Sequence, residues 1–208
     1  MARFNQDYFE KVTRAVEEAE EKTSAELVVA IHPQSGTYRD VDFLFAALAA
    51  FVGLLFIVFN PWTVHSALLI PFEVALLFVI GALASATWPR IRRRLCRAKR
   101  RECQVRSAAA AMFFEEGVAN TRDRTGVLVF LSRLEGQVEV IADIGVVRTV
   151  KPEQWGPCVF ALQKIGSASD VAAALLEGIA RLGEVLSEDL PPGEDNPDEI
   201  PNRPRTTE

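Results

Sequence analysis

Two long apolar runs interrupt a chain that is otherwise polar and regularly patterned. Residues 43–59 carry no charge, and residues 67–87 carry only Glu73. A helix needs about 20 apolar residues to cross a bilayer core about 30 Å thick, so each run is long enough to span it. The loop between them, residues 60–65, is too short for a domain. We therefore predict a transmembrane helical hairpin over residues 43–87.

The charges beside the hairpin predict its orientation. The connecting loop offers only His65, whereas the second run is followed by Arg90, Arg92, Arg93, Arg94, Arg97, Lys99, Arg100 and Arg101. By the positive-inside rule the basic end is cytoplasmic, and a hairpin returns the chain to the side where it started. We expect an inner (plasma) membrane protein with both termini in the cytoplasm. Trp62 and Trp88 are expected at the two interfaces.

The basic run also predicts a partner. Arg92, Arg93, Arg94, Arg97, Lys99, Arg100 and Arg101 are expected to contact anionic lipid headgroups, at about 1 kcal/mol per residue near the surface. Nucleic acid is the competing explanation for such a run. Lipid is favoured because the run adjoins a membrane span and the net charge of the chain is −5. We expect no nucleic-acid partner.

The remaining segments alternate between helical and strand patterns. Helices are expected over residues 5–22, 92–116, 152–165 and 171–186, and strands over residues 26–31, 126–132 and 137–142. The first two strands are separated by a crossover that contains a helix, so they should be parallel. Four residues join the last two strands, which demands an antiparallel hairpin. We predict an α/β fold in which helices pack on a small mixed sheet.

Periodic apolar residues define the expected core faces of these helices. They are Phe9, Val12, Val16 and Ala19 in the first helix, Val105, Ala109, Met112 and Phe113 in the second, and Val171, Leu175, Ile179, Leu182 and Leu186 in the last. Ser167 and Asp170 are similar to a capping box before the last helix. Gly117 is expected to end the second helix, and Gly156 with Pro157 to delay or kink the third.

The domain organisation follows from these assignments. Residues 1–42 and 88–187 form the two parts of one domain, which the membrane hairpin over residues 43–87 interrupts. Residues 188–208 form an acidic, proline-rich tail with almost no apolar side chains. Such a segment should be extended or disordered unless something binds it.

The cysteines and histidines exclude two kinds of site. Cys96, Cys103 and Cys158 are odd in number, form no C-x-x-C motif and have no nearby histidine, so neither a disulfide framework nor a zinc site is expected. We interpret them as free thiols, with Cys158 buried. The two histidines of the chain are too few for a histidine-rich metal centre.

Several segments together carry a resemblance to a known family. They are TSAELVVAI (residues 23–31), RTGVLVFLSRLEGQVEVIADIGV (residues 124–146) with Trp155 downstream, and NPDEIPNRP (residues 196–204). These resemble the TPM domain family, named for thylakoid and membrane proteins. The resemblance covers essentially every part outside the predicted membrane hairpin. It implies an α/β/α sandwich, and many bacterial members carry transmembrane helices.

The resemblance also implies two activities. Some soluble members bind calcium and some have been assigned an acid phosphatase activity, through acidic residues before the G-V-L strand. Others take part in photosystem repair or act as accessory subunits of membrane receptors. Here one carboxylate, Asp123, precedes the strand, and the hairpin brings Asp143 to the same edge of the sheet. Asp123 and Asp143 are therefore the candidate metal ligands.

Coordination chemistry argues against calcium at this edge. Calcium takes six to eight oxygen ligands, and Arg124 places a cation beside one of the few candidates. The alternative is that Asp123 forms a turn or an ion pair and that Asp143 caps the turn that follows it. We expect no cofactor, with calcium as the open alternative.

The sequence contains no motif that predicts a hydrolytic centre. The D-x-D motif, Asp40 and Asp42, precedes a membrane helix rather than following a strand, and Ser132 has no adjacent histidine or lysine in the sequence. Glu73 is the costliest residue in the predicted spans. It either contacts another membrane protein or a proton path, or lies near the outer interface, two residues after Pro71.

Two function classes follow. The favoured one is a membrane-anchored, non-enzymatic interaction or accessory module that faces the cytosol and binds a protein partner, with the acidic tail as a second contact. The alternative is a metal-dependent, phosphatase-like hydrolase at the edge formed by Asp123 and Asp143.

Overall fold

The computed structural model describes residues 4–60, 66, 68–193 and 199–206. It divides into two compact units, each described here by itself. The α/β unit comprises Met1–Gly36 and Glu102–Glu208, and the hairpin unit comprises Thr37–Arg101. The hairpin unit is thus inserted between the two sequence segments of the α/β unit.

A three-stranded sheet forms the centre of the α/β unit. Strands β1 (Leu27–His32), β2 (Val127–Ser132) and β3 (Gln137–Ala142) lie in the order β1-β2-β3. β1 and β2 are parallel, whereas β2 and β3 form an antiparallel hairpin. The mixed sheet that the sequence predicts is therefore confirmed.

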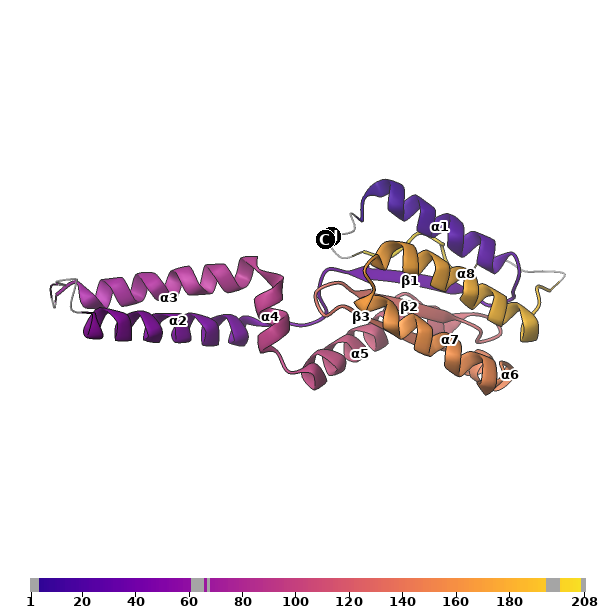
Figure 1. The fold of residues 1–208 in the computed structure, drawn as a ribbon. Coiled ribbons are helices and arrows are strands. Elements are labelled where there is room, and N and C mark those ends of the chain that lie inside the picture. The colour runs from indigo at the N-terminus through magenta and orange to yellow at the C-terminus, as the bar shows by residue number, and fades with distance from the viewer. Residues whose placement is uncertain (1–3, 61–65, 67, 194–198, 207–208) are drawn as a thin grey trace. The chain divides into compact units, whose positions relative to one another are not determined.

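Helices cover both faces of this sheet (Figure 1). Three of them pack on one face: α1 (Gln6–Glu20), α7 (Pro152–Lys164) and α8 (Val171–Asp189). Strand residues alternate between faces, and Leu27, Val29 and Ile31 of β1 point toward these helices. The short 3₁₀ helix Ile165–Ser167 links α7 to the turn before α8.

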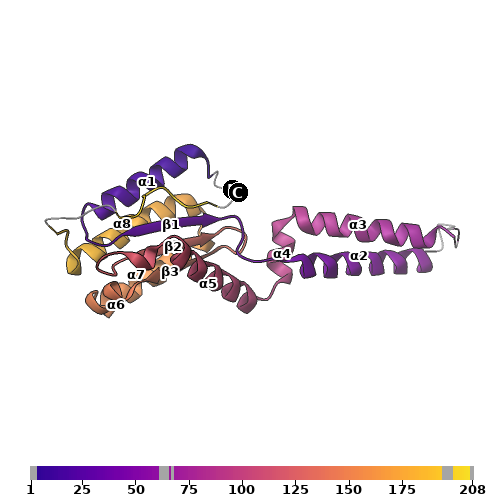
Figure 2. The ribbon, with the colours of Figure 1, turned by 180° about the vertical axis from the view of Figure 1, so that it is seen from behind.

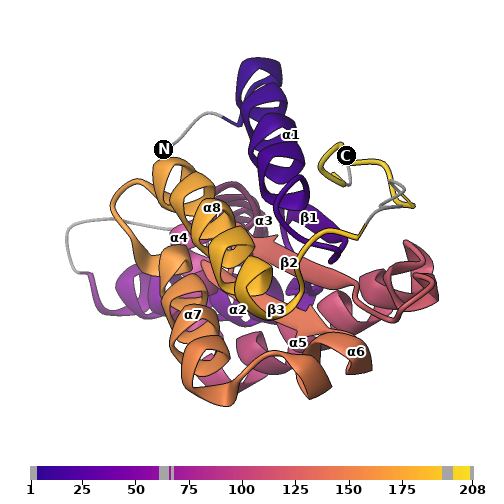
Figure 3. The same cartoon turned by 90° about the vertical axis from the view of Figure 1, so that its right-hand side faces the viewer.

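One long helix covers the opposite face (Figure 3). Helix α5 (Ala98–Glu115) packs there against β1 and β2, beside the 3₁₀ helix Val118–Asn120. The four apolar residues predicted for its core face are all buried: Val105, Ala109, Met112 and Phe113. The α/β unit is thus a three-layer α/β/α sandwich. Gly117 ends the helix with φ of 72°, a left-handed conformation that glycine adopts without strain.

The core faces of α1 and α8 match the sequence except at Phe9 and Val171, which are half-buried. Tyr8, rather than Phe9, is fully buried in α1, and its hydroxyl donates to the carbonyl of Ala172 at 3.0 Å. Asp170 caps α8 by accepting from the Ala172 and Ala173 N–H groups. Ser167 takes no part in that cap, because its hydroxyl donates to the Lys164 carbonyl.

Helix boundaries differ from the sequence prediction in three places. The predicted helix over residues 92–116 is two helices, α4 (Pro89–Leu95) and α5, because Cys96 is buried in an extended conformation between them. A six-residue helix, α6 (Ile144–Thr149), follows β3 where a turn was expected. Pro157 neither delays nor ends α7, which runs without interruption from Pro152.

The tail is bound by its own α/β unit. In residues 199–206, Ile200 is buried against α5 and β2, and Arg205 forms a parallel bridge with Ala30 of β1. Figure 2 shows the yellow tail beside β1. The sequence predicts an extended or disordered tail unless something binds it, and here Ile200 and Arg205 bind its described part to the α/β unit.

The hairpin unit contains two helices that are long and apolar enough to span a membrane. α2 (Arg39–Phe59) and α3 (Ile70–Thr87) have 21 and 18 residues, which correspond to about 32 and 27 Å. Only 22% of the apolar stretch of α2 and 11% of that of α3 are buried. The core helix of a globular protein would be mostly buried. Trp62 and His65 lie outside the described residues.

Candidate functional site

The first candidate site is the edge of the sheet where β3 ends. Asp143 follows β3 and caps α6, and its Oδ1 accepts from the Ile144 N–H at 2.6 Å. Its own N–H donates to the Gly126 carbonyl at 2.9 Å, which fixes the start of β2 beside the start of α6. The residue is only 5% exposed. A carboxylate in this position is favoured by the helix N-terminus.

Arg124 supplies the positive charge at this edge. Its Nε lies 2.7 Å from Oδ2 of Asp143, and its Nη2 donates to Oδ1 at 3.0 Å. Both carboxylate oxygens of Asp143 therefore contact the guanidinium. Arg124 has φ of 59°, a left-handed conformation that is uncommon outside glycine. The arginine is thus the charge partner of the Asp143 carboxylate.

Asp123 points elsewhere. Its side chain is 71% exposed, and the nearest cation is the Arg122 Nε at 3.9 Å. The backbone around it is nevertheless close to α6, because a Cβ on Gly145 would lie 2.6 Å from the Asp123 carbonyl and 2.5 Å from the Arg124 carbonyl. The structure therefore brings the two segments together, but no contact within the described residues joins the Asp123 and Asp143 carboxylates.

A wider ligand set is also missing at this edge. Among the described residues, no group of three or more His, Cys, Asp or Glu side chains is arranged to hold a metal ion. Calcium would need further oxygens besides Asp143, whose carboxylate already neutralises Arg124. Chemically, the arrangement supports a helix cap and an ion pair that join the loop before β2 to α6.

A second polar cluster, which the sequence analysis missed, lies at the other end of the strands. Ser132 ends β2, and its hydroxyl donates to the Glu135 carboxylate in the turn before β3. The Ser35 hydroxyl donates to the Ser132 hydroxyl at 2.7 Å, and the Ser35 N–H donates to Glu135 at 3.1 Å. Glu135 is 1% exposed. The cluster fixes the point where the chain leaves β1 to enter the hairpin unit.

His32 is the neighbour of Ser132 in the sheet. The two residues are partners in the parallel register, which the sequence analysis overlooked when it found no histidine beside Ser132. The imidazole packs on Phe130 at 4.8 Å between ring centroids, and its Nε2 has no hydrogen-bond partner among the described residues. Burial lowers the pKa of His32 from its usual value, although Glu115 and Glu116 oppose this shift. No hydrogen bond joins His32 to Ser132 in the described structure, and Ser132 is fully buried.

Their location could have been found from the sequence. Both strands end in a polar residue after five apolar or small ones, and a parallel pair brings such ends together. The carboxyl ends of parallel strands are where α/β folds most often place ligands. Here that end is closed by the buried Ser132 and Glu135 side chains.

The D-x-D motif clamps the base of the hairpin. The Asp42 carboxylate accepts from the Arg92 Nε at 2.9 Å and Nη2 at 2.7 Å, and the Ser85 hydroxyl donates to it at 2.7 Å. Asp40 pairs with Arg100. Arg92 and Arg100, two of the predicted lipid contacts, therefore have carboxylate partners within the hairpin unit.

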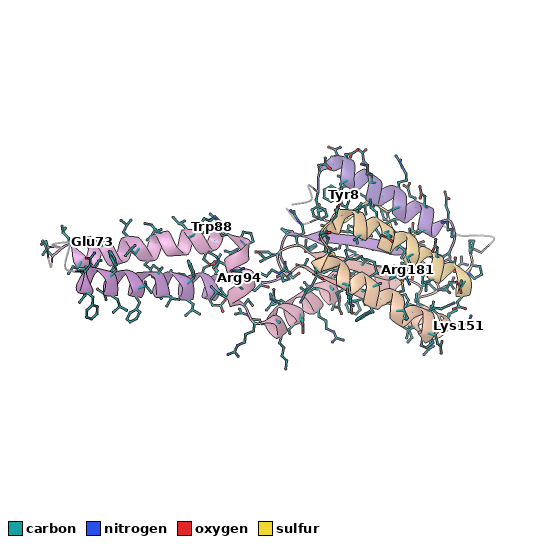
Figure 4. All side chains as sticks on the ribbon, in the orientation of Figure 1. Tyr8, Glu73, Trp88, Arg94, Lys151 and Arg181 are labelled. Carbon is teal, nitrogen blue, oxygen red and sulfur yellow. The ribbon has the colours of Figure 1, made fainter. Side chains whose placement is uncertain are left out.

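Four of the predicted lipid contacts remain open to solvent. Arg93, Arg94, Arg97 and Lys99 are exposed, and no ion pair with another described residue engages them. Arg101 is half-buried. Arg94 and Trp88 lie at the same end of the hairpin, as Figure 4 shows. Cations and an aromatic ring at one end of an apolar helix pair are typical of a membrane interface.

Glu73 lies at the opposite end of the hairpin (Figure 4). It is in the first turn of α3, where the helix N-terminus favours a carboxylate. Its side chain is half-buried. The residue lies near the end of the helix and not in its middle. This position favours the interpretation that Glu73 lies near the outer interface.

Comparison with known proteins gives a fold and no family. No protein-family model matches the chain, and no curated protein matches it. Among solved structures, the chain is similar to the NMR structure of BA42 protein from the psychrophilic bacteria Bizionia argentinensis sp. nov.. The TM-score is 0.59 over 100% of this chain and 98% of that chain, at 16% sequence identity. This likeness shows the shared α/β fold alone, so the TPM resemblance stays a prediction.

Proposed function

We propose that this protein is a membrane-anchored interaction module without enzymatic activity. The observation that carries the proposal is the pairing of Asp143 with Arg124. Asp143 is the one buried carboxylate of the candidate metal site, and Arg124 already pairs with it. In this proposal, the edge of the sheet therefore has a structural role. The TPM resemblance supplies the precedent of accessory subunits of membrane receptors.

The hairpin unit is the proposed anchor. Its helices present large apolar side chains outward, for example Phe56 at 64%, Phe59 at 77% and Phe72 at 72% exposure. Such surfaces are stable in lipid and are costly in water. The cations Arg93, Arg94, Arg97 and Lys99 would contact anionic headgroups, and in this proposal they and the α/β unit face the cytoplasm.

The native cysteines provide a test of this topology. Cys103 is exposed, whereas Cys96 and Cys158 are buried. A membrane-impermeant maleimide should label Cys103 in inside-out vesicles and leave it unlabelled in intact spheroplasts. The matched control is the Cys103→Ser variant, which should lose the label in both. Labelling in spheroplasts would contradict the cytoplasmic orientation.

The interaction itself is testable in living cells. A photoreactive amino acid replaces Phe114 on α5 or Phe160 on α7, which are 70% and 58% exposed. We expect a discrete crosslinked adduct from at least one of the two positions, and none from the buried control position Leu182. Absence of any adduct, together with phosphate-ester turnover that disappears in Asp143→Asn, would favour the hydrolase instead.

A further inference from the structure

The outer edge of β1 is built to hold an extended peptide. β1 is an edge strand, so its outward N–H and C=O groups need partners other than β2. The Leu27 N–H is bonded by the Glu20 carboxylate at 2.7 Å. The Val29 carbonyl and the Ile31 N–H bond the backbone of Arg205 at 2.9 and 2.8 Å. The tail therefore joins this edge of the sheet through one parallel bridge, between Ala30 and Arg205.

Three side chains anchor the tail, and the first is Glu199, whose carboxylate accepts from the Arg122 N–H at 2.9 Å. Ile200 is 7% exposed and joins the apolar cluster that α5 forms with β1 and β2. The Arg205 guanidinium pairs with the Glu116 carboxylate just after α5, where the two side chains are 22% and 29% exposed. The edge thus supplies a backbone ladder, an apolar seat and a carboxylate. Together these features select an extended segment with an apolar residue and an arginine five positions later.

The tail covers this edge in part, with Ile200 and Pro204 buried. In the described part of the chain one bridge, Ala30 with Arg205, joins it to β1. A cavity of about 480 Å³ lies between the tail and α1, beside Phe9 and Pro204. Another of about 270 Å³ lies between the tail and the turn after α5, beside Asn120 and Pro201. The ion pair is partly exposed and both hollows open to solvent, so these parts of the contact are accessible from outside.

We propose that the edge of β1 is a docking site for an extended segment of another protein, and that the C-terminal tail occupies this site in cis. The partner segment would add to the sheet as a strand, place an apolar side chain in the seat of Ile200 and an arginine on Glu116. The tail then acts as a built-in competitor that sets how readily the partner binds. This inference rests on the proposed interaction function and names its surface and its ligand.

A peptide with the tail sequence is the probe. Fluorescein-labelled EIPNRPRT, residues 199–206, is titrated into the purified full-length protein in detergent, and anisotropy reports binding. The wild-type protein should bind it weakly because its own tail competes. The full-length variant Ile200→Asp with Arg205→Glu should bind it at least about tenfold more tightly, since two side-chain anchors of the competitor are lost.

A charge reversal tests the site itself. Adding Glu116→Arg to that variant should remove the gain, and a peptide with glutamate in place of the arginine equivalent to Arg205 should restore it. Arg205→Ala is a gentler variant that leaves Ile200 in place, and it should show a smaller gain in the same direction. Thermal melts of each variant establish that it is folded.

Three results would overturn the inference. They are equal peptide affinity in the wild-type and tail-released proteins, affinity that is insensitive to Glu116→Arg, and a wild-type dimer that becomes monomeric when the tail is released. The last result would make a second copy of this chain the occupant. Crosslinked adducts at Phe114 or Phe160 without peptide binding would leave the proposed function standing and reject this site alone.

Discussion

Replacing Glu135 by alanine should destabilise the α/β unit strongly, although the residue lies in a surface turn by sequence. Its carboxylate is 1% exposed and accepts hydrogen bonds from the Ser132 hydroxyl and the Ser35 N–H. Each hydrogen bond to a charged group contributes about 1.5–3 kcal/mol, and relief of the buried charge offsets part of their loss. We expect a net loss of about 2–4 kcal/mol in the free energy of unfolding.

This loss should be visible as a fall in melting temperature of about 5–15 °C in detergent, followed by tryptophan fluorescence. Glu135→Gln keeps an oxygen acceptor and the side-chain shape, so it should lose about half as much or less. Glu17→Ala is the matched control, because Glu17 is exposed on α1. If Glu135→Ala melted within a degree of that control, the cluster would have no role in holding the turn against the residues after β1.

Two further predictions concern charge. Burial lowers the pKa of His32, so the unfolded chain binds its proton more tightly and the stability should fall as the pH drops through about 6.5. His32→Asn should flatten that part of the profile of melting temperature against pH, and an unchanged profile would refute the role of His32. Asp42→Asn should destabilise the hairpin unit by about 1–3 kcal/mol, because Arg92 loses its bidentate partner in a site only 13–20% exposed. The charge-swapped variant Asp42→Arg with Arg92→Asp should recover part of that loss in a detergent melt, and no recovery would argue against a specific pair.

The layers of the fold were predictable from local patterns. The helical spacing of apolar residues predicts the core faces of α5 and α8. The four-residue connection between β2 and β3 requires that these strands pair antiparallel. These features depend on residues that are near one another in sequence. For the same reason the sequence also indicates the two apolar helices of the hairpin unit.

What the sequence did not reveal depends on contacts between distant residues. Ser132 and Glu135 look like an ordinary turn until β1 brings Ser35 beside them. The tail has too few apolar residues to predict a bound segment, yet Ile200 finds a seat that α5 and β2 build together. Local composition reports neither the seat nor its partner.

At the candidate metal site, the sequence predicted the position of the backbone but not the directions of the side chains. The antiparallel pairing predicted for β2 and β3 places Asp123 and Asp143 at one edge of the sheet. The close approach of Gly145 to the Asp123 carbonyl agrees with this prediction. Side-chain direction then separated them, because Arg124 takes a left-handed conformation and covers Asp143. A single non-glycine residue with positive φ is invisible to periodicity, so the sequence pattern could not predict the ion pair between Arg124 and Asp143.

The most direct test of the account is the melting temperature of the detergent-purified protein as calcium is added. A ligand that binds only the folded state must raise the melting temperature. With Asp143 held by Arg124, we predict no shift at millimolar calcium, and the same result for Asp143→Asn apart from its lower starting stability. A calcium-dependent rise in the wild-type protein that vanishes in Asp143→Asn would contradict the account and establish a native metal site.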